Sequence, residues 1–391
     1  MDAGEVIRRC RQLAEFSEEA GATTRTFLSP PMREAHRLVR GWMEAAGMSV
    51  YVDAAGNLRG VFGCGTRPIM IGSHLDTVPR AGAFDGVLGV VMAIALVEAR
   101  PERRLPIEVV AFSDEEGARF GIPFIGSRAV TGRPVMDAAV LEAIREYGLD
   151  PEELHLACAA DEMKGYLEFH IEQGPVLDEL GLPLAVVESI LGLTRMQVTF
   201  RGQANHAGTT PMRLRRDALA AAAEWISAVE RTAAETEGLV ATVGQLHVAP
   251  NAANAVPGAV RASLDARHAR DRVRLNAVDA LSETARSIAA RRRIQVELQN
   301  LLGQPAVAMD RGMMQLLERA VADAGYPVHR MSSGAGHDAM IMAERLPAAM
   351  LFVRSPGGIS HQPDETVRED DVAAALGVGT RFLDLWEKAD G

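Results

Sequence analysis

Residues 69–78 read IMIGSHLDTV, residues 85–99 read DGVLGVVMAIALVEA, and residues 107–117 read IEVVAFSDEEG. The first and third stretches begin with short apolar runs typical of buried strands, and the second is an apolar run of helical length. A strand, a helix and a second strand in this order form the repeating unit of an α/β fold. These stretches therefore predict a sheet with helices on its faces, in which each strand ends at polar residues.

The order of the remaining elements predicts a second domain inserted into the first. Strands are expected at 194–201, 240–248, 259–266 and 294–298, with helices at 216–233 and 271–290. This is the strand–helix–strand–strand–helix–strand order of a ferredoxin-like α+β domain. We place that domain at residues 192–303. The α/β domain then comprises residues 1–191 and 304–391, with further helices at 5–16, 32–47, 310–324 and 370–388 and a strand at 348–353.

Length and composition narrow the possible functions. The 391 residues exceed the roughly 250–300 residues of a single core, which agrees with two domains. A formal net charge of -11 argues against a nucleic-acid partner. Three cysteines without a CxxC pair predict neither a disulfide framework nor a thiolate metal site: Cys10, Cys64 and Cys158. No signal peptide or membrane span is recognisable, so we expect a cytoplasmic protein without membrane association.

The predicted strand ends carry residues suited to metal binding. His74 ends the first strand, and Asp76 lies two residues further on, where an extended chain points both side chains the same way. Asp76 is therefore predicted to hydrogen-bond the imidazole nitrogen that does not bind metal. Asp85 opens the apolar helix, where it could be a simple N-cap or a ligand. An isolated HxD pair is weak evidence for a metal site, so the prediction rests on His74, Asp76 and Asp85 together with the residues described next.

Three further stretches complete a ligand set. Glu115 and Glu116 follow an apolar strand within a run of three carboxylates, whose mutual repulsion a bound cation would relieve; the alternative is a solvated acidic turn. His170 lies in LEFHIEQGP, and His361 ends the glycine-rich loop SPGGISHQPDE. Mixed imidazole and carboxylate ligands suit Zn²⁺ or Mn²⁺. Adjacent side chains diverge, so one of the two glutamates can bind metal while the other faces the substrate water, which leaves five ligands. Five ligands exceed what one open site needs, so we expect two ions, with Asp85 as the bridging carboxylate.

Taken together, the motifs resemble the M20 metallopeptidase superfamily over about residues 5–388. They are GSHLDTV, AFDGVLGV, SDEEGARF, FHIEQGP, NHAGTTPM and GGISHQPDE. FHIEQGP is typical of the branch that contains allantoate amidohydrolases, N-carbamoyl-L-amino-acid hydrolases and β-ureidopropionase-type enzymes. The resemblance implies a zinc-peptidase-like catalytic domain with a mixed sheet flanked by helices, and an inserted lid that also forms a homodimer interface. VPRAGAFDG has less glycine before Asp85 than many relatives carry, although Asp85 itself is retained.

The resemblance also implies a role for each residue of the metal site. His74 and His170 hold one ion, His361 and Glu116 hold the other, Asp85 bridges the two, and Glu115 is the general base. Substrate contacts are implied at five positions: Gln173, His206, Asn254, Arg267 and the backbone of Gly336. The chemistry is reasonable, because an arginine binds a carboxylate in bidentate fashion and a histidine can stabilise an oxyanion. The alternatives are a surface ion pair for Arg267 and turn chemistry for Asn254.

We therefore predict a metal-dependent hydrolase that cleaves the ureido group of a small carboxylate and releases ammonia and carbon dioxide. RTFLSPP at 25–31, RGWMEAAG at 40–47 and DAAGN at 53–57 look most like allantoate amidohydrolases, which ranks allantoate first. N-carbamoyl-L-amino acids are the second substrate class. A dipeptidase or deacylase is a weaker alternative, and a non-catalytic metal-binding scaffold is an alternative of a different kind.

Overall fold

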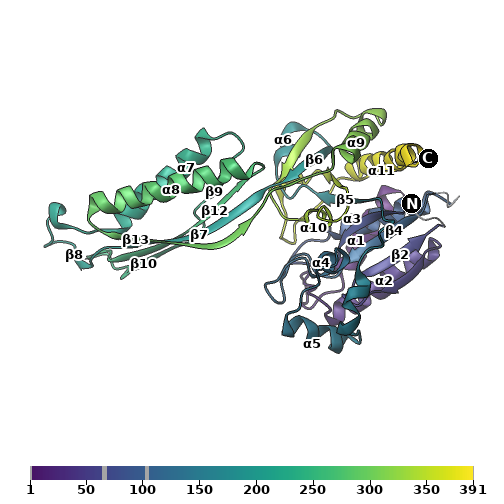
Figure 1. The fold of residues 1–391 in the computed structure, drawn as a ribbon, viewed down its shortest axis with the longest axis horizontal. Helices are drawn as coiled ribbons and strands as arrows, with labels where there is room; N and C mark the ends of the chain where they lie inside the picture. The colour runs from purple at the N-terminus through teal and green to yellow at the C-terminus, as the bar shows by residue number, and fades with distance from the viewer. Residues whose placement is uncertain (1, 64–67, 102–104, 391) are drawn as a thin grey trace. The chain divides into compact units, whose positions relative to one another are not determined.

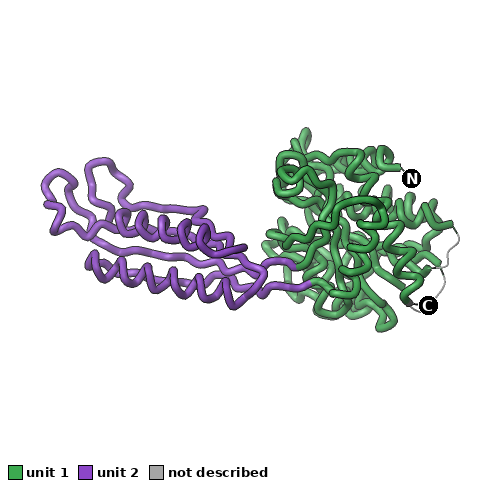
Figure 2. Tube along the Cα trace, turned by 90° about the horizontal axis from the view of Figure 1, so that it is seen from above, with its two compact units in different colours: residues 1–188, 309–391 green, residues 189–308 purple. Residues whose placement is uncertain are grey.

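The computed structural model describes residues 2–63, 68–101 and 105–390. The chain forms two compact units, residues 1–188 with 309–391 (unit 1) and residues 189–308 (unit 2), which Figure 2 shows in two colours. The insertion expected at 192–303 falls inside unit 2. Cys10 and Cys158 are free thiols, and Cys64 lies outside the described residues. None of the helices in the described ranges combines the length and the apolar character needed to cross a membrane.

A mixed sheet forms the centre of unit 1, as predicted (Figure 1). Within unit 1 its strand order is β1-β2-β4-β3-β5-β16-β6, and β15 also pairs with β6. β3, β4, β5 and β16 are parallel, whereas β1, β2 and β6 join antiparallel. The strands are β1 (Ser49–Val52), β2 (Leu58–Phe62), β3 (Ile69–His74), β4 (Ile107–Phe112), β5 (Gly165–Ile171), β6 (Leu184–Ile190), β15 (Arg330–Ser333) and β16 (Ala348–Val353). The last two residues of β6 belong to unit 2, where they pair with β14 (Val307–Ala308).

Helices cover this sheet, and their boundaries follow local signals in the sequence. They are α1 (Ala3–Ala14), α2 (Pro30–Ala45), α3 (Val87–Glu98), α4 (Ile125–Val130), α5 (Ala138–Tyr147), α6 (Val176–Leu180), α9 (Arg311–Asp323), α10 (Asp338–Met342) and α11 (Glu369–Asp390), with the 3₁₀ turns η1 (Pro151–Ala157) and η3 (Pro356–Gly358). The Ser29 side chain caps α2 and two prolines follow it, a standard helix start. α3 is apolar on all sides because it packs on β3 and β5 beneath α1 and α11.

Unit 2 is an antiparallel sheet with two helices packed on it. The sheet order is β10-β12-β7-β13, with β9 also pairing with β12, and β8 and β11 form a separate two-stranded sheet. The elements are β7 (Gly192–Arg201), β8 (Asn205–His206), η2 (Met212–Leu214), α7 (Ala218–Glu235), β9 (Val240–Thr242), β10 (Leu246–Ala249), β11 (Ala255–Val256), β12 (Ala259–His268), α8 (Asp271–Arg292) and β13 (Gln295–Gln304). Trp225, Phe200 and Leu281 lie in a core between sheet and helices.

The single strand predicted at 240–248 is in fact two strands, β9 and β10. Both pair with β12, β9 opposite Asp265 to Arg267 and β10 opposite Ala259 to Ala262. Between them the Ser263 hydroxyl accepts the Gln245 N–H at 3.0 Å. A side-chain oxygen thus takes an N–H that a continuous ladder would pair with a backbone carbonyl, and the strand is interrupted there.

Candidate metal centre

The predicted metal ligands come from segments that end at one edge of the unit 1 sheet. β3, β4, β5 and β16 are parallel, so their carboxyl ends lie at the same edge. His74 is the last residue of β3, and His170 is the last but one of β5. Glu115 and Glu116 follow β4 in a turn, and His361 lies in the loop after β16. This edge is where α/β folds usually place their sites.

His74, Asp85 and His170 form a buried group whose ligand atoms all lie within 4.8 Å of one another. His170 Nε2 is 3.5 Å from His74 Nε2 and 3.2 Å from Asp85 Oδ1. Each Nδ1 contacts a backbone carbonyl, Asp76 O for His74 and Ile171 O for His170. Because a carbonyl only accepts hydrogen bonds, each Nδ1 carries hydrogen in the neutral imidazole, and Nε2 is the nitrogen available to a metal.

Asp85, Glu116 and His361 form a second group that also lies within 4.8 Å. His361 Nε2 is 3.1 Å from Asp85 Oδ2 and 3.4 Å from Glu116 Oε1. This group is more open, since the His361 side chain is 47% exposed whereas the Asp85 side chain is 3% exposed. Asp85 belongs to both groups, with Oδ1 facing His170 and Oδ2 facing His361. A carboxylate that offers one oxygen to each of two groups has the arrangement that a bridging ligand requires.

The pKa values show how strongly these groups interact. Burial opposes charge on His74, but Asp76 and the neighbouring carboxylates outweigh it and raise the pKa of His74 well above its usual value. Burial lowers the pKa of His170 to about 4. Burial together with Asp85 raises the pKa of Glu116 to about 7, and the hydrogen bond to Asp85 raises the pKa of His361 to about 9. The site therefore concentrates negative charge that calls for a cation.

These residues fit a metal centre. Asp85 Oδ1 is buried and has no hydrogen-bond partner among the described residues, since the His170 Nε2 that lies 3.2 Å away carries no hydrogen in the neutral imidazole. Leaving a buried carboxylate oxygen unpaired is costly, and such an atom needs a partner that the protein itself does not supply. Three imidazoles and two carboxylates without sulfur form a donor set that suits Zn²⁺ or Mn²⁺.

Glu115 lies next to the two groups but belongs to neither. Burial raises the pKa of Glu115 well above its ordinary value, which makes its carboxylate a stronger base. Asp76 positions this turn, because its two oxygens accept the N–H groups of Glu115 at 2.9 Å and Glu116 at 3.0 Å. Asp76 Oδ1 also lies 3.4 Å from His74 Nδ1, close to the contact predicted from the HxD spacing.

Asp85 does not cap α3, so its interpretation as a simple N-cap was wrong. The N-cap is Gly86, with φ +65°, so no side chain caps the first turn of α3. A Cβ atom on Gly86 would lie 2.4 Å from the His74 imidazole. Glycine therefore lets the chain pass against His74 and leaves the Asp85 carboxylate to the site.

Gln173 and its neighbour Glu172 behave differently. Gln173 Nε2 lies 2.9 Å from Asp85 Oδ2 and 3.2 Å from His361 Nε2, so its amide is within the second group. Its φ of +59° is unusual for a non-glycine residue, and such strain is often found at functional sites. The Glu172 carboxylate turns away and accepts the N–H groups of Val176 and Leu177 at the start of α6. The predicted contact of Gln173 with substrate stays a prediction.

The predicted substrate residues of unit 2 are not all together. β8 pairs with β11, and the Ala207 N–H donates to Asn254 O at 2.9 Å, which holds His206 and Asn254 close to each other. Both are exposed. Arg267 lies near the other end of β12, eight residues beyond Ala259 and therefore roughly 26 Å along the strand. Its guanidinium binds Asp265 through two hydrogen bonds, at 2.7 and 3.0 Å.

The sequence-based prediction missed the neighbours of Gly336. His337 packs against His170 with ring centroids 4.3 Å apart, and with Glu168 these residues form a third group of possible ligands. Glu168 already accepts hydrogen bonds from Ser73 and from the Ala339 N–H. The motif SGAGHD had directed attention to the Gly336 backbone alone, although its histidine was visible.

Comparisons with known proteins agree with this geometry. Residues 70–385 match the model of peptidase family M20/M25/M40. An N-carbamoyl-L-amino acid amidohydrolase from Geobacillus stearothermophilus is 40% identical, with 98% of each chain covered. Allantoate deiminase 1 from Glycine max is 38% identical over 97% of this chain and 89% of that protein. A crystal structure of a hydantoinase/carbamoylase family amidase from Burkholderia multivorans superposes with a TM-score of 0.90 at 30% identity, covering 98% and 97% of the two chains.

Proposed function

The chain belongs to peptidase family M20/M25/M40, and from this premise we propose that it is a hydrolase of the ureido group of a small carboxylate. The bond that breaks is a C–N bond other than a peptide bond, as the names of the amidohydrolase and deiminase relatives suggest. The observation that carries the proposal is the position of Asp85, whose two oxygens face two separate groups of ligands.

We assign two divalent metal ions, Mn²⁺ or Zn²⁺, to these groups. His74 and His170 would hold one ion, Glu116 and His361 would hold the other, and Asp85 would bridge them. When bound, such ions polarise a carbonyl and lower the pKa of water. The shared donor set does not distinguish the two metals.

Glu115 is the proposed general base. Its buried carboxylate accepts a proton from the attacking water and returns it to the leaving nitrogen, and the raised pKa suits both steps. Water adds to the ureido carbonyl and one C–N bond breaks. The resulting carbamate loses carbon dioxide, so one water molecule converts R–NH–CO–NH₂ into R–NH₂, CO₂ and NH₃.

His206 is the proposed donor to the developing oxyanion. The N–H groups of Gly208 and Thr209 both donate to His206 Nδ1, at 3.1 and 3.2 Å. Nδ1 is therefore the acceptor nitrogen, and Nε2 carries the hydrogen that an oxyanion requires. The side chain is exposed on unit 2, where it can meet a substrate.

A homodimer is part of the proposal. His206 and Arg267 lie at opposite ends of the unit 2 sheet, and a small substrate does not span roughly 26 Å. If both residues contact one substrate, they come from different copies of the chain. A cytoplasmic location remains an expectation from the sequence.

Allantoate is the first candidate substrate, and an N-carbamoyl-L-amino acid is the second. Both carry a ureido group and a carboxylate, which Gln173, Asn254, Arg267 and the Gly336 backbone would recognise. Names of relatives at similar identity support both classes, 40% for the amidohydrolase and 38% for the deiminase. The peptidase or deacylase alternative would instead release an amino acid or acid without ammonia.

The test is an ammonia-release assay on protein stripped with a chelator and reconstituted with Mn²⁺ or Zn²⁺. Allantoate, several N-carbamoyl-L-amino acids and a dipeptide are compared at equal concentration. We expect ammonia from a ureido compound only in the reconstituted protein. Amino acids released from the dipeptide, with no ammonia from any ureido compound, would replace the proposal with a dipeptidase. Metal binding without turnover of any of these substrates would support a non-catalytic metal-binding scaffold instead.

A further inference from the structure

We infer that Glu365 is a positioning residue that fixes the Asp85 loop and the His361 loop relative to each other, which rests on the two-metal function proposed above. Glu365 is buried, at 5% exposure, and follows His361 by four residues. Its carboxylate lies between two loops that are 280 residues apart in sequence. The sequence-based prediction assigned it no role.

Three hydrogen bonds connect Glu365 to both loops. Oε1 accepts the N–H groups of Phe84 at 2.8 Å and Asp85 at 3.0 Å. Oε2 accepts the Ser360 hydroxyl at 3.0 Å, and Ser360 Oγ is also 3.4 Å from Asp85 Oδ2. Glu365 thus holds the backbone of Asp85, the proposed bridging residue, and the side chain of Ser360, which directly precedes His361. The partners of its carboxylate are backbone N–H groups and a hydroxyl group, so Glu365 acts on the proposed metal site through other residues.

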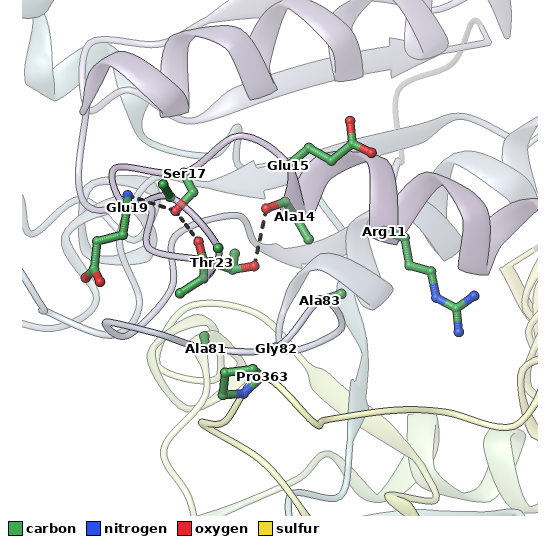
Figure 3. A pocket seen from close by; sticks show the side chains of 13 residues that line it. Arg11, Ala14, Glu15, Ser17, Glu19, Thr23, Ala81, Gly82, Ala83 and Pro363 are labelled. Atoms are coloured by element: carbon green, nitrogen blue, oxygen red, sulfur yellow. Dashed lines mark hydrogen bonds between the residues drawn. The ribbon is translucent and has the colours of Figure 1, made fainter.

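Close packing at Gly82 supports this connection independently. A Cβ atom on Gly82 would lie 2.3 Å from Glu365 Cβ and 2.6 Å from Oε1. The glycine therefore allows the Asp85 loop to lie directly on the Glu365 side chain. Gly82 and Pro363, one from each loop, also lie together in the lining of a groove of about 600 Å³ that is otherwise formed mainly by residues 11–23 (Figure 3).

The expected consequence is weaker binding of the ion assigned to Asp85, Glu116 and His361 when Glu365 is lost. Groups that support metal ligands from outside typically contribute about 10–100-fold to metal affinity. The His361 group is the more exposed one and depends on a loop, so it has less other support. The ion assigned to His74 and His170 should be affected less.

The experiment measures metal content and affinity by elemental analysis and calorimetry on E365Q, E365D and E365A. Glutamine can keep all three hydrogen bonds, with its oxygen accepting the two N–H groups and its NH₂ donating to Ser360. We expect E365Q to bind two ions with nearly normal affinity, and E365D and E365A to lose at least about tenfold at one ion. G82A, which pushes the carboxylate away, should resemble E365A and gives a second measurement if E365A folds poorly.

Asp53 provides the matched control. Its buried carboxylate also accepts two backbone N–H groups, from Ala55 and Asn57, and one side-chain N–H from Asn57. D53A should lower the unfolding temperature of the metal-free protein but keep two ions bound. Normal affinity for both ions in E365A and G82A would overturn the inference, and so would equal losses in E365Q and E365A, which would indicate a role of charge. No metal bound by the unaltered chain would instead reject the proposed function.

Discussion

The candidate residues of unit 1 and unit 2 differ in burial and in their partners. His74, Asp85 and His170 are between 1% and 3% exposed and contact one another, whereas His206 is exposed and its imidazole contacts its own loop. Buried groups that share partners build a preformed site, because each holds the next in place. Exposed groups are ready to meet a ligand. Changes to the ligand groups of unit 1 should therefore alter metal content, whereas changes to the candidate residues of unit 2 should alter turnover or substrate binding and leave metal content unchanged.

Glu115 is the strongest test, because it lies in unit 1 but outside both ligand groups. We expect E115Q to lower kcat by about 10²–10⁴-fold, the usual contribution of a general base, while two metal ions remain bound. Turnover by ammonia release and metal content by elemental analysis are measured on the same sample. The matched control is E116Q, which should lose metal. Unchanged turnover in metal-loaded E115Q would remove Glu115 from the mechanism.

His206 tests the unit 2 side of the comparison. We expect H206A to lower kcat by about 10²–10³-fold, as the loss of one oxyanion donor does, with metal content and unfolding temperature unchanged. His247 is an exposed histidine on β10 and serves as the control, so H247A should keep full activity. Loss of metal from H206A would contradict the division of roles between the units.

Arg267 should give a smaller effect that appears in KM. A hydrogen bond to a charged group is worth about 1.5–3 kcal/mol, so R267K should raise KM by about 10–100-fold, since lysine cannot replace a bidentate guanidinium. Arg261 on the same strand is exposed, and R261K is the control. If R267K changes only the unfolding temperature and not KM, Arg267 has a structural role through its ion pair with Asp265 and does not bind substrate.

The sequence was most informative where local pattern and site coincide. One apolar strand ends in His74 and another is followed by Asp114, Glu115 and Glu116, which predicts functional residues at the sheet edge. The structure brings the five predicted ligands into two groups there. This works because parallel strands carry their carboxyl ends to one edge, so a strand pattern already indicates where its last residues lie.

The sequence was least informative where a role depends on distant backbone. Glu365 accepts N–H groups 280 and 281 residues away, a contact that no local pattern encodes. Glu172, two residues after His170, binds the N–H groups at the start of α6, because the chain leaves β5 after Ile171. The sequence also could not show that Asp85 does not cap α3, because the helix begins one residue later than expected and Gly86 takes the N-cap position.

Unit 1 also buries polar groups that belong to neither ligand group, of which His36 on α2 is an example. Its Nδ1 contacts the Tyr147 hydroxyl at 3.0 Å, and its Nε2 is buried without a hydrogen-bond partner among the described residues. Burial, with smaller effects of nearby arginines, lowers the pKa of His36 to about 3. An unfolded histidine titrates near its usual pKa of about 6.5.

Between these two pKa values the unfolded chain binds a proton that the folded chain does not, so acid below about pH 6.5 destabilises the fold through His36. In this range the free energy of unfolding falls by up to about 1.4 kcal/mol for each pH unit of acidification. H36Q can still accept a hydrogen bond from Tyr147 through its amide oxygen. When the pH falls from 7.5 to 5, we expect the free energy of unfolding of H36Q to decrease by about 2 kcal/mol less than that of the unaltered chain. Urea unfolding of chelator-treated protein measures this difference, and H155Q, at an exposed histidine, should keep the original slope. Parallel pH profiles for H36Q and the unaltered chain would mean that the folded protein protonates His36 as readily as the unfolded chain does.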